Sequence, residues 1–195
     1  MLSKTVIMSI ENSLFKINRE ITQYLLETMG VARVNSMRLF TLPEYVSFER
    51  GDIDGDTFYN TVIPNCLKQP LALEQVKSAY VRHITDNTRL IDFVIDGTFP
   101  LILVGNTTEW SLPKFQLSRF KYPIFKSSDL HYRKEDLEFF EIILAKAGVL
   151  ADEIRYLGTE LEDVQAAKDA GIQNADVITN TDMLCAELDG LRSKD

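Results

Sequence analysis

Five short runs rich in aliphatic residues recur along the chain, and helical patterns separate the later ones. The runs cover residues 5–10, 101–104, 122–125, 154–157 and 175–179. Their length and composition are typical of strands that are buried on both faces of a sheet. Helical spacing is clear in Leu90, Ile91 and Val94, again over residues 137–144, and over residues 161–170, where Gly171 supplies a C-terminal stop.

Strands that alternate with helices of this length predict a parallel sheet with right-handed crossovers. We therefore expect an α/β fold: a Rossmann-like three-layer sandwich around a five-stranded, mainly parallel sheet.

The stretch between the first two runs breaks this rhythm. It carries helical periodicity over residues 17–28, 57–67 and 73–83, and it contains no convincing strand. This predicts a helical cap inserted after the first strand. We assign residues 1–15 and 87–195 to the α/β core and residues 16–86 to the cap.

Composition limits the function. Of the 195 residues, 45% are hydrophobic and 26% are charged, which excludes disorder as the main state, and the net charge of −8 argues against nucleic acid or an anionic membrane as a partner. No secretory signal fits the first 15 residues, and Cys66 and Cys185 have no metal-binding or redox spacing. We expect a cytoplasmic protein with reduced thiols.

Ligands of parallel α/β sheets bind beyond the carboxyl ends of the strands. Polar residues follow these ends here, and we expect them to share one crevice. They are Ser9, Glu11 and Asn12 after the first run, Gly105 and Asn106 after the second, Lys134 after the third, and Thr159, Glu160 and Asp163 after the fourth.

Four segments of the chain, in this order, resemble the motifs of the haloacid dehalogenase-like (HAD-like) hydrolase superfamily, in the phosphatase branch with a small helical cap. They are Phe48-Glu49-Arg50-Gly51-Asp52-Ile53, Leu103-Val104-Gly105-Asn106-Thr107, residues 127–140 around Lys134, and residues 158–171, Gly158-Thr159-Glu160-Leu161-Glu162-Asp163 onward. The resemblance covers nearly the whole chain and implies the α/β fold with its cap.

The departures from the family pattern bear on function. Members carry "DxDGT" after the first strand, where the first Asp attacks phosphorus and the second is the general acid/base. Here Ser9 and Glu11 stand at those positions, Gly105 replaces the phosphate-binding Ser or Thr, and Thr159 replaces a magnesium-binding Asp. Lys134 matches the family's lysine.

A neutral serine hydroxyl is a poor nucleophile without a base, and His83 and His131 are each expected to be ordinary surface or core residues. Magnesium prefers carboxylate oxygens, and two of them are missing. We therefore expect no catalytic residue, no metal and no cofactor. If a cation bound at all, Glu160 and Asp163 would hold it, and magnesium would matter only with residual activity.

Lys134 has two open interpretations. Its ammonium could draw an anion into the crevice, or it could pair with Glu11, Glu160 or Asp163 as a scaffold contact. The candidate ligand-binding residues are Ser9, Glu11, Gly105, Asn106, Lys134 and Thr159.

A second acidic stretch, residues 52–57, looks superficially like a displaced "DxDGT" or the start of a calcium loop. No strand precedes it, and Ile63 stands where a calcium-binding Glu would be needed. We expect a cap turn in which Asp56 caps the following helix.

The leading functional hypothesis is a catalytically inactive pseudo-hydrolase that binds a small anionic ligand or a protein partner. The alternative is a phosphatase of small phosphorylated metabolites with altered chemistry, in which Ser9, or a water activated by Glu11, attacks.

Overall fold

A computed structural model describes residues 5–68, 70–178 and 180–192 of the chain. Its centre is a sheet of five parallel strands in the order β5-β4-β1-β6-β7. The strands are β1 (Thr5–Ser9), β4 (Leu101–Gly105), β5 (Ile124–Lys126), β6 (Ile154–Gly158) and β7 (Ala175–Val177). The predicted α/β fold with a five-stranded parallel sheet is confirmed.

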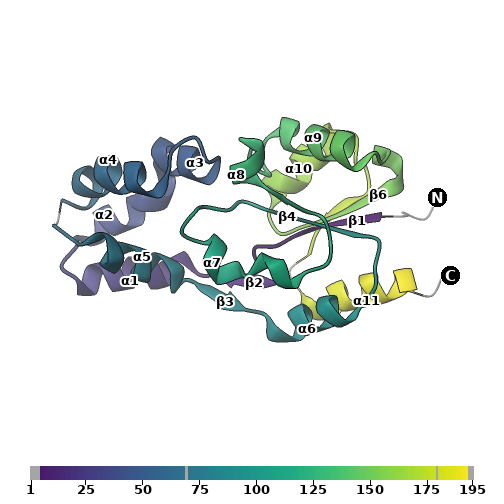
Figure 1. Cartoon of the computed structure of the whole chain (residues 1–195), viewed down its shortest axis with the longest axis horizontal. Coiled ribbons are helices and arrows are strands. Elements are labelled where there is room, and N and C mark those ends of the chain that lie inside the picture. Colours follow the sequence, from purple (N-terminus) through teal and green to yellow (C-terminus); the bar gives the residue numbers. More distant parts are fainter. Residues whose placement is uncertain (1–4, 69, 179, 193–195) are drawn as a thin grey trace.

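Helices cover both faces of this sheet, so the core has three layers (Figure 1). Those of the core are α6 (Thr88–Asp96), α7 (Leu112–Phe115), α8 (Ser127–Leu130), α9 (Leu137–Ala147), α10 (Leu161–Asp169) and α11 (Thr181–Arg192). Side chains alternate along β1, so Ile7 packs towards α9 and α10, while Val6 and Met8 pack towards α6 and α11. This explains why the strands are apolar throughout.

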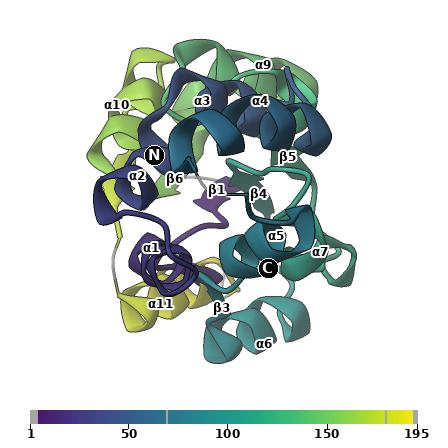
Figure 2. The same cartoon turned by 90° about the vertical axis from the view of Figure 1, so that its left-hand side faces the viewer.

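Five further helices lie beyond the carboxyl ends of the strands, and we call them the cap helices (Figures 1 and 2). They are α1 (Arg19–Thr28), α2 (Arg33–Arg38), α3 (Pro43–Glu49), α4 (Gly55–Leu67) and α5 (Leu73–Val81). One short 3₁₀ turn, Leu39–Thr41, lies among them, and two more, Leu117–Arg119 and Ala151–Glu153, lie in the core. The cap helices share a separate apolar cluster, to which the sheet contributes nothing. Trp110, from the loop after β4, joins that cluster against Phe48 and Phe58.

The expectation of no strand between residues 16 and 86 is wrong. Two three-residue strands, β2 (Phe15–Ile17) and β3 (Ile84–Asp86), pair antiparallel where the chain enters and leaves the cap helices. Each is too short to show a period of two in the sequence, and the pair forms only because the two ends of the insertion meet. The boundary at residues 15/16 falls within β2, and the boundary at 86/87 falls directly after β3. The division into core and cap stays a prediction.

Several expected boundaries shift by a few residues. β5 begins at Ile124 because Pro123 has no N–H to donate to the sheet, and its carbonyl accepts from Leu103 instead. Asp54, not Asp56, caps α4: its side chain accepts a hydrogen bond of 2.7 Å from the amide of Thr57. Residue 179, the predicted end of the last strand, lies outside the described residues.

Other expectations hold. Gly171 follows α10 with a φ of +94°, in the left-handed region that a helix stop requires. Both cysteines are free thiols and half-buried. Within the described part of the chain, no helix is long and apolar enough to cross a membrane.

The packing of α9 on the sheet can be tested at Phe140. This side chain is fully buried, and its ring lies edge-on to the ring of Tyr156 of β6, with 4.8 Å between the ring centres. We expect Phe140→Ala to lower the free energy of unfolding by about 3–5 kcal/mol, because it leaves a cavity in the core. Leu161→Ala is the control, since this side chain is 74% exposed, and it should cost less than about 0.5 kcal/mol. Urea unfolding measures both, and equal losses would contradict this packing.

Candidate functional site

The polar residues at the strand ends meet around the ammonium group of Lys134. Its Nζ donates to Ser9 Oγ at 2.6 Å and lies 3.4 Å from Asp163 Oδ2 and 3.6 Å from Glu11 Oε2. Lys134 is 3% exposed, while Ser9 and Asp163 are fully buried. Of the two open interpretations of Lys134, the pairing with carboxylates is seen in the structure, and its partners are Glu11 and Asp163.

Glu160 is not part of this cluster. Its Oε1 accepts a hydrogen bond of 3.0 Å from Asn12 Nδ2 at the exposed mouth of the site. Asn12 has a φ of +59°, a left-handed conformation that asparagine tolerates better than most residues.

Lys134 and Glu11 shift each other's pKa. Burial by itself lowers the pKa of Lys134, but the carboxylates of Glu11 and Asp163 outweigh it, and the net shift is upward. Burial raises the pKa of Glu11 to about 7, although Lys134 opposes the shift. Lys134 is thus an ammonium that donates to Ser9 Oγ, and it cannot serve as a base for that hydroxyl.

The side chain of Glu11 lies directly over Gly105, at the end of β4. A Cβ atom at Gly105 would come within 2.8 Å of Glu11 Oε2. Any larger residue at position 105, including Ser or Thr, therefore requires Glu11 to move. The substitutions at positions 11 and 105 are sterically linked, a relation that spacing along the sequence does not show.

Asp163 is held by the start of α10. Its Oδ2 accepts from the amide of Thr159 at 3.5 Å, and its Oδ1 accepts from the amide of Glu160 at 3.4 Å. The hydroxyls of Thr159 and Ser9 both donate to the carbonyl of Glu11, each at 3.2 Å. The chain therefore already supplies donors to both side-chain oxygens of Asp163 and to the backbone carbonyl of Glu11.

This donor set does not fit magnesium. The ion needs several free oxygens in near-octahedral geometry, whereas the oxygens of Asp163 face Lys134 and two backbone amides. Among the described residues, no group of three or more His, Cys, Asp and Glu side chains is placed to hold a metal. The side chains of Glu160 and Asp163, which were expected to hold any cation, do not converge on one point, because Glu160 turns towards Asn12.

A second charged layer joins the core to the cap helices, and sequence reasoning missed it. Glu49, at the end of α3, is buried, and its Oε2 lies 2.9 Å from Arg133 Nε. Arg133 Nε is also 3.3 Å from Glu135 Oε2, and Arg19 Nη2 is 3.7 Å from Glu49 Oε1. Burial raises the pKa of Glu49, and the two arginines counteract it. The resemblance had placed Glu49 and Arg133 within matching segments but had assigned neither a role.

Asn106 belongs to the same layer. Its Nδ2 donates to both carboxylate oxygens of Glu135 at 3.0 Å, and its Oδ1 accepts from the amide of Lys134 at 2.9 Å. It therefore holds the backbone of the loop that carries Lys134.

The cap helices are clamped against the core beside this layer. Arg50 donates from Nη2 to both oxygens of Asp136 at 2.8 Å, and Ser127 Oγ donates to the carbonyl of Glu49. Gly51 has a φ of +71°, and a Cβ there would meet the carbonyl oxygen of Ser128 at 2.6 Å. Only glycine permits this approach of the two backbones.

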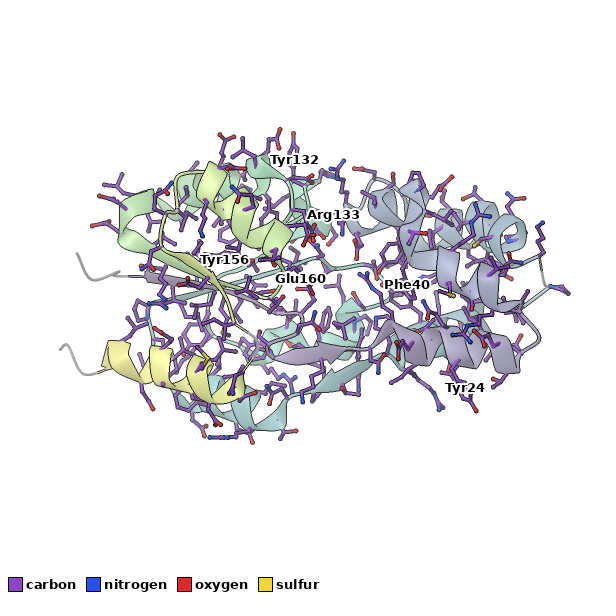
Figure 3. The ribbon with its side chains drawn as sticks, turned by 180° about the vertical axis from the view of Figure 1, so that it is seen from behind. Tyr24, Phe40, Tyr132, Arg133, Tyr156 and Glu160 are labelled. Atoms are coloured by element: carbon purple, nitrogen blue, oxygen red, sulfur yellow. The ribbon has the colours of Figure 1, made fainter. Side chains whose placement is uncertain are left out.

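A cavity of about 550 Å³ lies between the core cluster and the cap helices. Seen from behind in Figure 3, Arg133 and Glu160 lie on the side of the core that faces the cap helices, and Phe40 lies on the cap side. Glu11, Asn106, Lys134 and Thr159 line the cavity, whereas Ser9 lies beneath Lys134 and Gly105 lies beneath Glu11. The cap adds Arg19, Tyr45, Glu49, Tyr80 and His83 to its wall.

Neither histidine is a candidate base. His83 lies in the turn after α5 rather than in the helix itself, and it is buried with its Nδ1 3.0 Å from Thr22 Oγ1. Burial, with help from Arg19, lowers the pKa of His83 to about 4, so its ring is neutral near pH 7. His131 is exposed and lies 3.0 Å from Asp52. The expectation of ordinary core and surface histidines is confirmed.

Glu11 should make the stability of the protein depend on pH. Because its pKa is about 7 in the fold and ordinarily 4.5, its contribution to stability is fully present below pH 4.5 and is lost as pH rises through about 7. We expect Glu11→Gln to gain stability relative to the wild type over this window, by on the order of 2–3 kcal/mol. Urea unfolding at pH values from 5 to 8 measures this difference in the free energy of unfolding.

Glu138→Gln removes an exposed carboxylate on α9 and is the matched control. Its free energy of unfolding should differ from that of the wild type by a small amount that is the same at every pH. A constant difference for Glu11→Gln as well would show that the carboxyl group of Glu11 titrates normally.

Comparison with known proteins gives structural matches only. No protein-family model matches the chain, and no curated protein matches it in sequence. A protein from Porphyromonas gingivalis described as a predicted HAD-like family hydrolase superposes with a TM-score of 0.80 at 17% identity, over 100% of both chains. A HAD family enzyme from Bacteroides thetaiotaomicron, in complex with magnesium and inorganic phosphate, gives a TM-score of 0.78 at 16% identity, over 90% of this chain and 93% of that one.

A HAD phosphatase from Thermococcus onnurineus matches less well, with a TM-score of 0.54 at 18% identity, over 90% of this chain and 86% of that one. Identities at this level establish the fold and leave the activity open. The fold of this chain is that of the HAD-like hydrolases.

Proposed function

We propose that this protein is a pseudo-hydrolase: a HAD-like scaffold that binds a small molecule between core and cap and does not transfer phosphoryl groups. The observation that carries the proposal is the cluster of Ser9, Glu11 and Lys134. The ammonium that would attract a phosphate is paired within the chain, and a carboxylate covers Gly105.

Charge supports the same conclusion. A phosphate ester brings negative charge, and phosphoryl transfer depends on cations that neutralise it. Glu11 and Asp163 already compensate the charge of Lys134, so a phosphate placed there would find no free positive charge and would be repelled by the two carboxylates. Ser9 is fully buried, and the hydrogen bond from an ammonium lowers the electron density on its oxygen.

The alternative is a phosphatase with altered chemistry, and one observation favours it. A carboxyl group with a pKa of about 7, as in Glu11, can accept or donate a proton at neutral pH. In this version Glu11 activates a water molecule. The two functions differ in whether a phosphate ester is turned over.

A direct assay separates them. We expect the purified chain to show no turnover of p-nitrophenyl phosphate or of a sugar-phosphate panel, with or without magnesium. Turnover that Ser9→Ala or Glu11→Gln abolishes, in protein that remains folded by circular dichroism, would establish the phosphatase and end the pseudo-hydrolase proposal.

Restoring carboxylates gives the complementary test. We expect Ser9→Asp with Thr159→Asp alone to stay inactive, because Glu11 still occupies the space over Gly105. Adding Glu11→Asp shortens that side chain, and the triple variant should show magnesium-dependent hydrolysis of p-nitrophenyl phosphate. Activity in the double variant equal to that of the triple one would mean that Glu11 does not block the site.

A further inference from the structure

The cavity between core and cap is lined by more carboxylates than cations. Five acidic side chains contribute to its wall: Glu11, Glu20, Glu49, Glu135 and Glu160. Three basic side chains do so: Arg19, Arg133 and Lys134. His83 adds no charge near pH 7, because burial keeps its ring neutral. This balance is the opposite of the one that a phosphate site requires.

The three basic side chains are also engaged within the protein. Lys134 is shared by Glu11 and Asp163, and Arg133 lies between Glu49 and Glu135. The guanidinium of Arg19 lies 3.7 Å from Glu49 and 5.7 Å from the centre of the Tyr45 ring. An incoming anion would therefore have to break existing ion pairs.

Hydrogen-bond acceptors, by contrast, remain available. Glu11 Oε2 and Glu49 Oε2 are buried and have no hydrogen-bond partner among the described residues, although each lies near a cation. Glu49 is 3% exposed, so its oxygen has little contact with solvent. The ion pairs with Arg133 and Lys134 offset part of the cost of burying these oxygens, and a ligand that donates well-aligned hydrogen bonds to them would offset more of it.

We propose that this cavity binds a small, hydroxylated amine in its ammonium form, with the amine placed between Glu11 and Glu49. This rests on the proposed function, because it uses the same site and assigns its ligand class. A volume of about 550 Å³ suits a molecule the size of a sugar alcohol. Tyr45 and Tyr80 in the cap wall supply aromatic surface for its carbon chain. The small anionic ligand that Lys134 suggested from the sequence is the competing possibility.

Three probes with a six-carbon polyol chain distinguish an ammonium ligand from an anionic one. D-Glucamine is cationic, D-sorbitol is neutral and D-sorbitol 6-phosphate is anionic. Isothermal titration of the full chain at pH 7.5 should give a Kd for glucamine at least roughly tenfold lower than for sorbitol, since a hydrogen-bonded charge contributes more than a neutral group. Sorbitol 6-phosphate should bind more weakly than sorbitol.

Variants test the placement of the amine. Glu49→Gln and Glu11→Gln should each weaken glucamine binding about tenfold and leave sorbitol binding within about twofold. Glu138→Gln, an exposed carboxylate outside the cavity, should change neither. If a buried variant fails to fold, Glu160→Gln at the exposed mouth serves instead, and it should weaken glucamine binding severalfold.

The contrary results are distinct from those that test the proposed function. Tighter binding of sorbitol 6-phosphate than of glucamine, or no glucamine binding at millimolar concentration, overturns the amine proposal and leaves the pseudo-hydrolase intact. Hydrolysis of sorbitol 6-phosphate overturns the proposed function itself.

Discussion

The buried ammonium of Lys134 is the constraint around which the strand ends are arranged. A buried charge is tolerated only when it is paired and hydrogen-bonded. Ser9 from β1, Glu11 from the following loop and Asp163 from α10 together meet that need. These segments are energetically coupled through Lys134 although they lie far apart in the chain.

The same pairing determines what the site can do. Glu11 Oε2 lies both beside Lys134 and over Gly105, so a hydroxyl side chain at position 105 would require Glu11 to shift. Asp163 turns to Lys134 and to the first amides of α10, which leaves it without free oxygens for a metal. The side chains of Ser9, Glu11 and Asp163 and the space over Gly105 are thus parts of one connected arrangement around Lys134.

The cap helices extend this charge network. Glu49 brings a second buried carboxylate to the cavity and is held by Arg133 of the core, while Arg50 clamps Asp136 nearby. The wall of the cavity therefore depends on contacts between cap and core, and the acidic character of the cavity comes from both. Few of the acidic residues behind the net charge of −8 lie at the cavity, and those few set its local charge.

The sequence by itself determined the five strands, the helices α6, α9 and α10 and the set of polar residues at the strand ends, because apolar periodicity and strand-end position are local properties. It could not show the β2–β3 pair, since three-residue strands leave no pattern, nor the choice of Asp54 over Asp56 as the cap of α4. Only the tertiary structure decided that Lys134 pairs with Glu11 and Asp163 but not with Glu160. It alone placed Glu11 over Gly105 and brought Glu49 and Arg133 to one cavity, because these contacts join residues separated by dozens of positions and depend on distances that spacing along a chain does not encode.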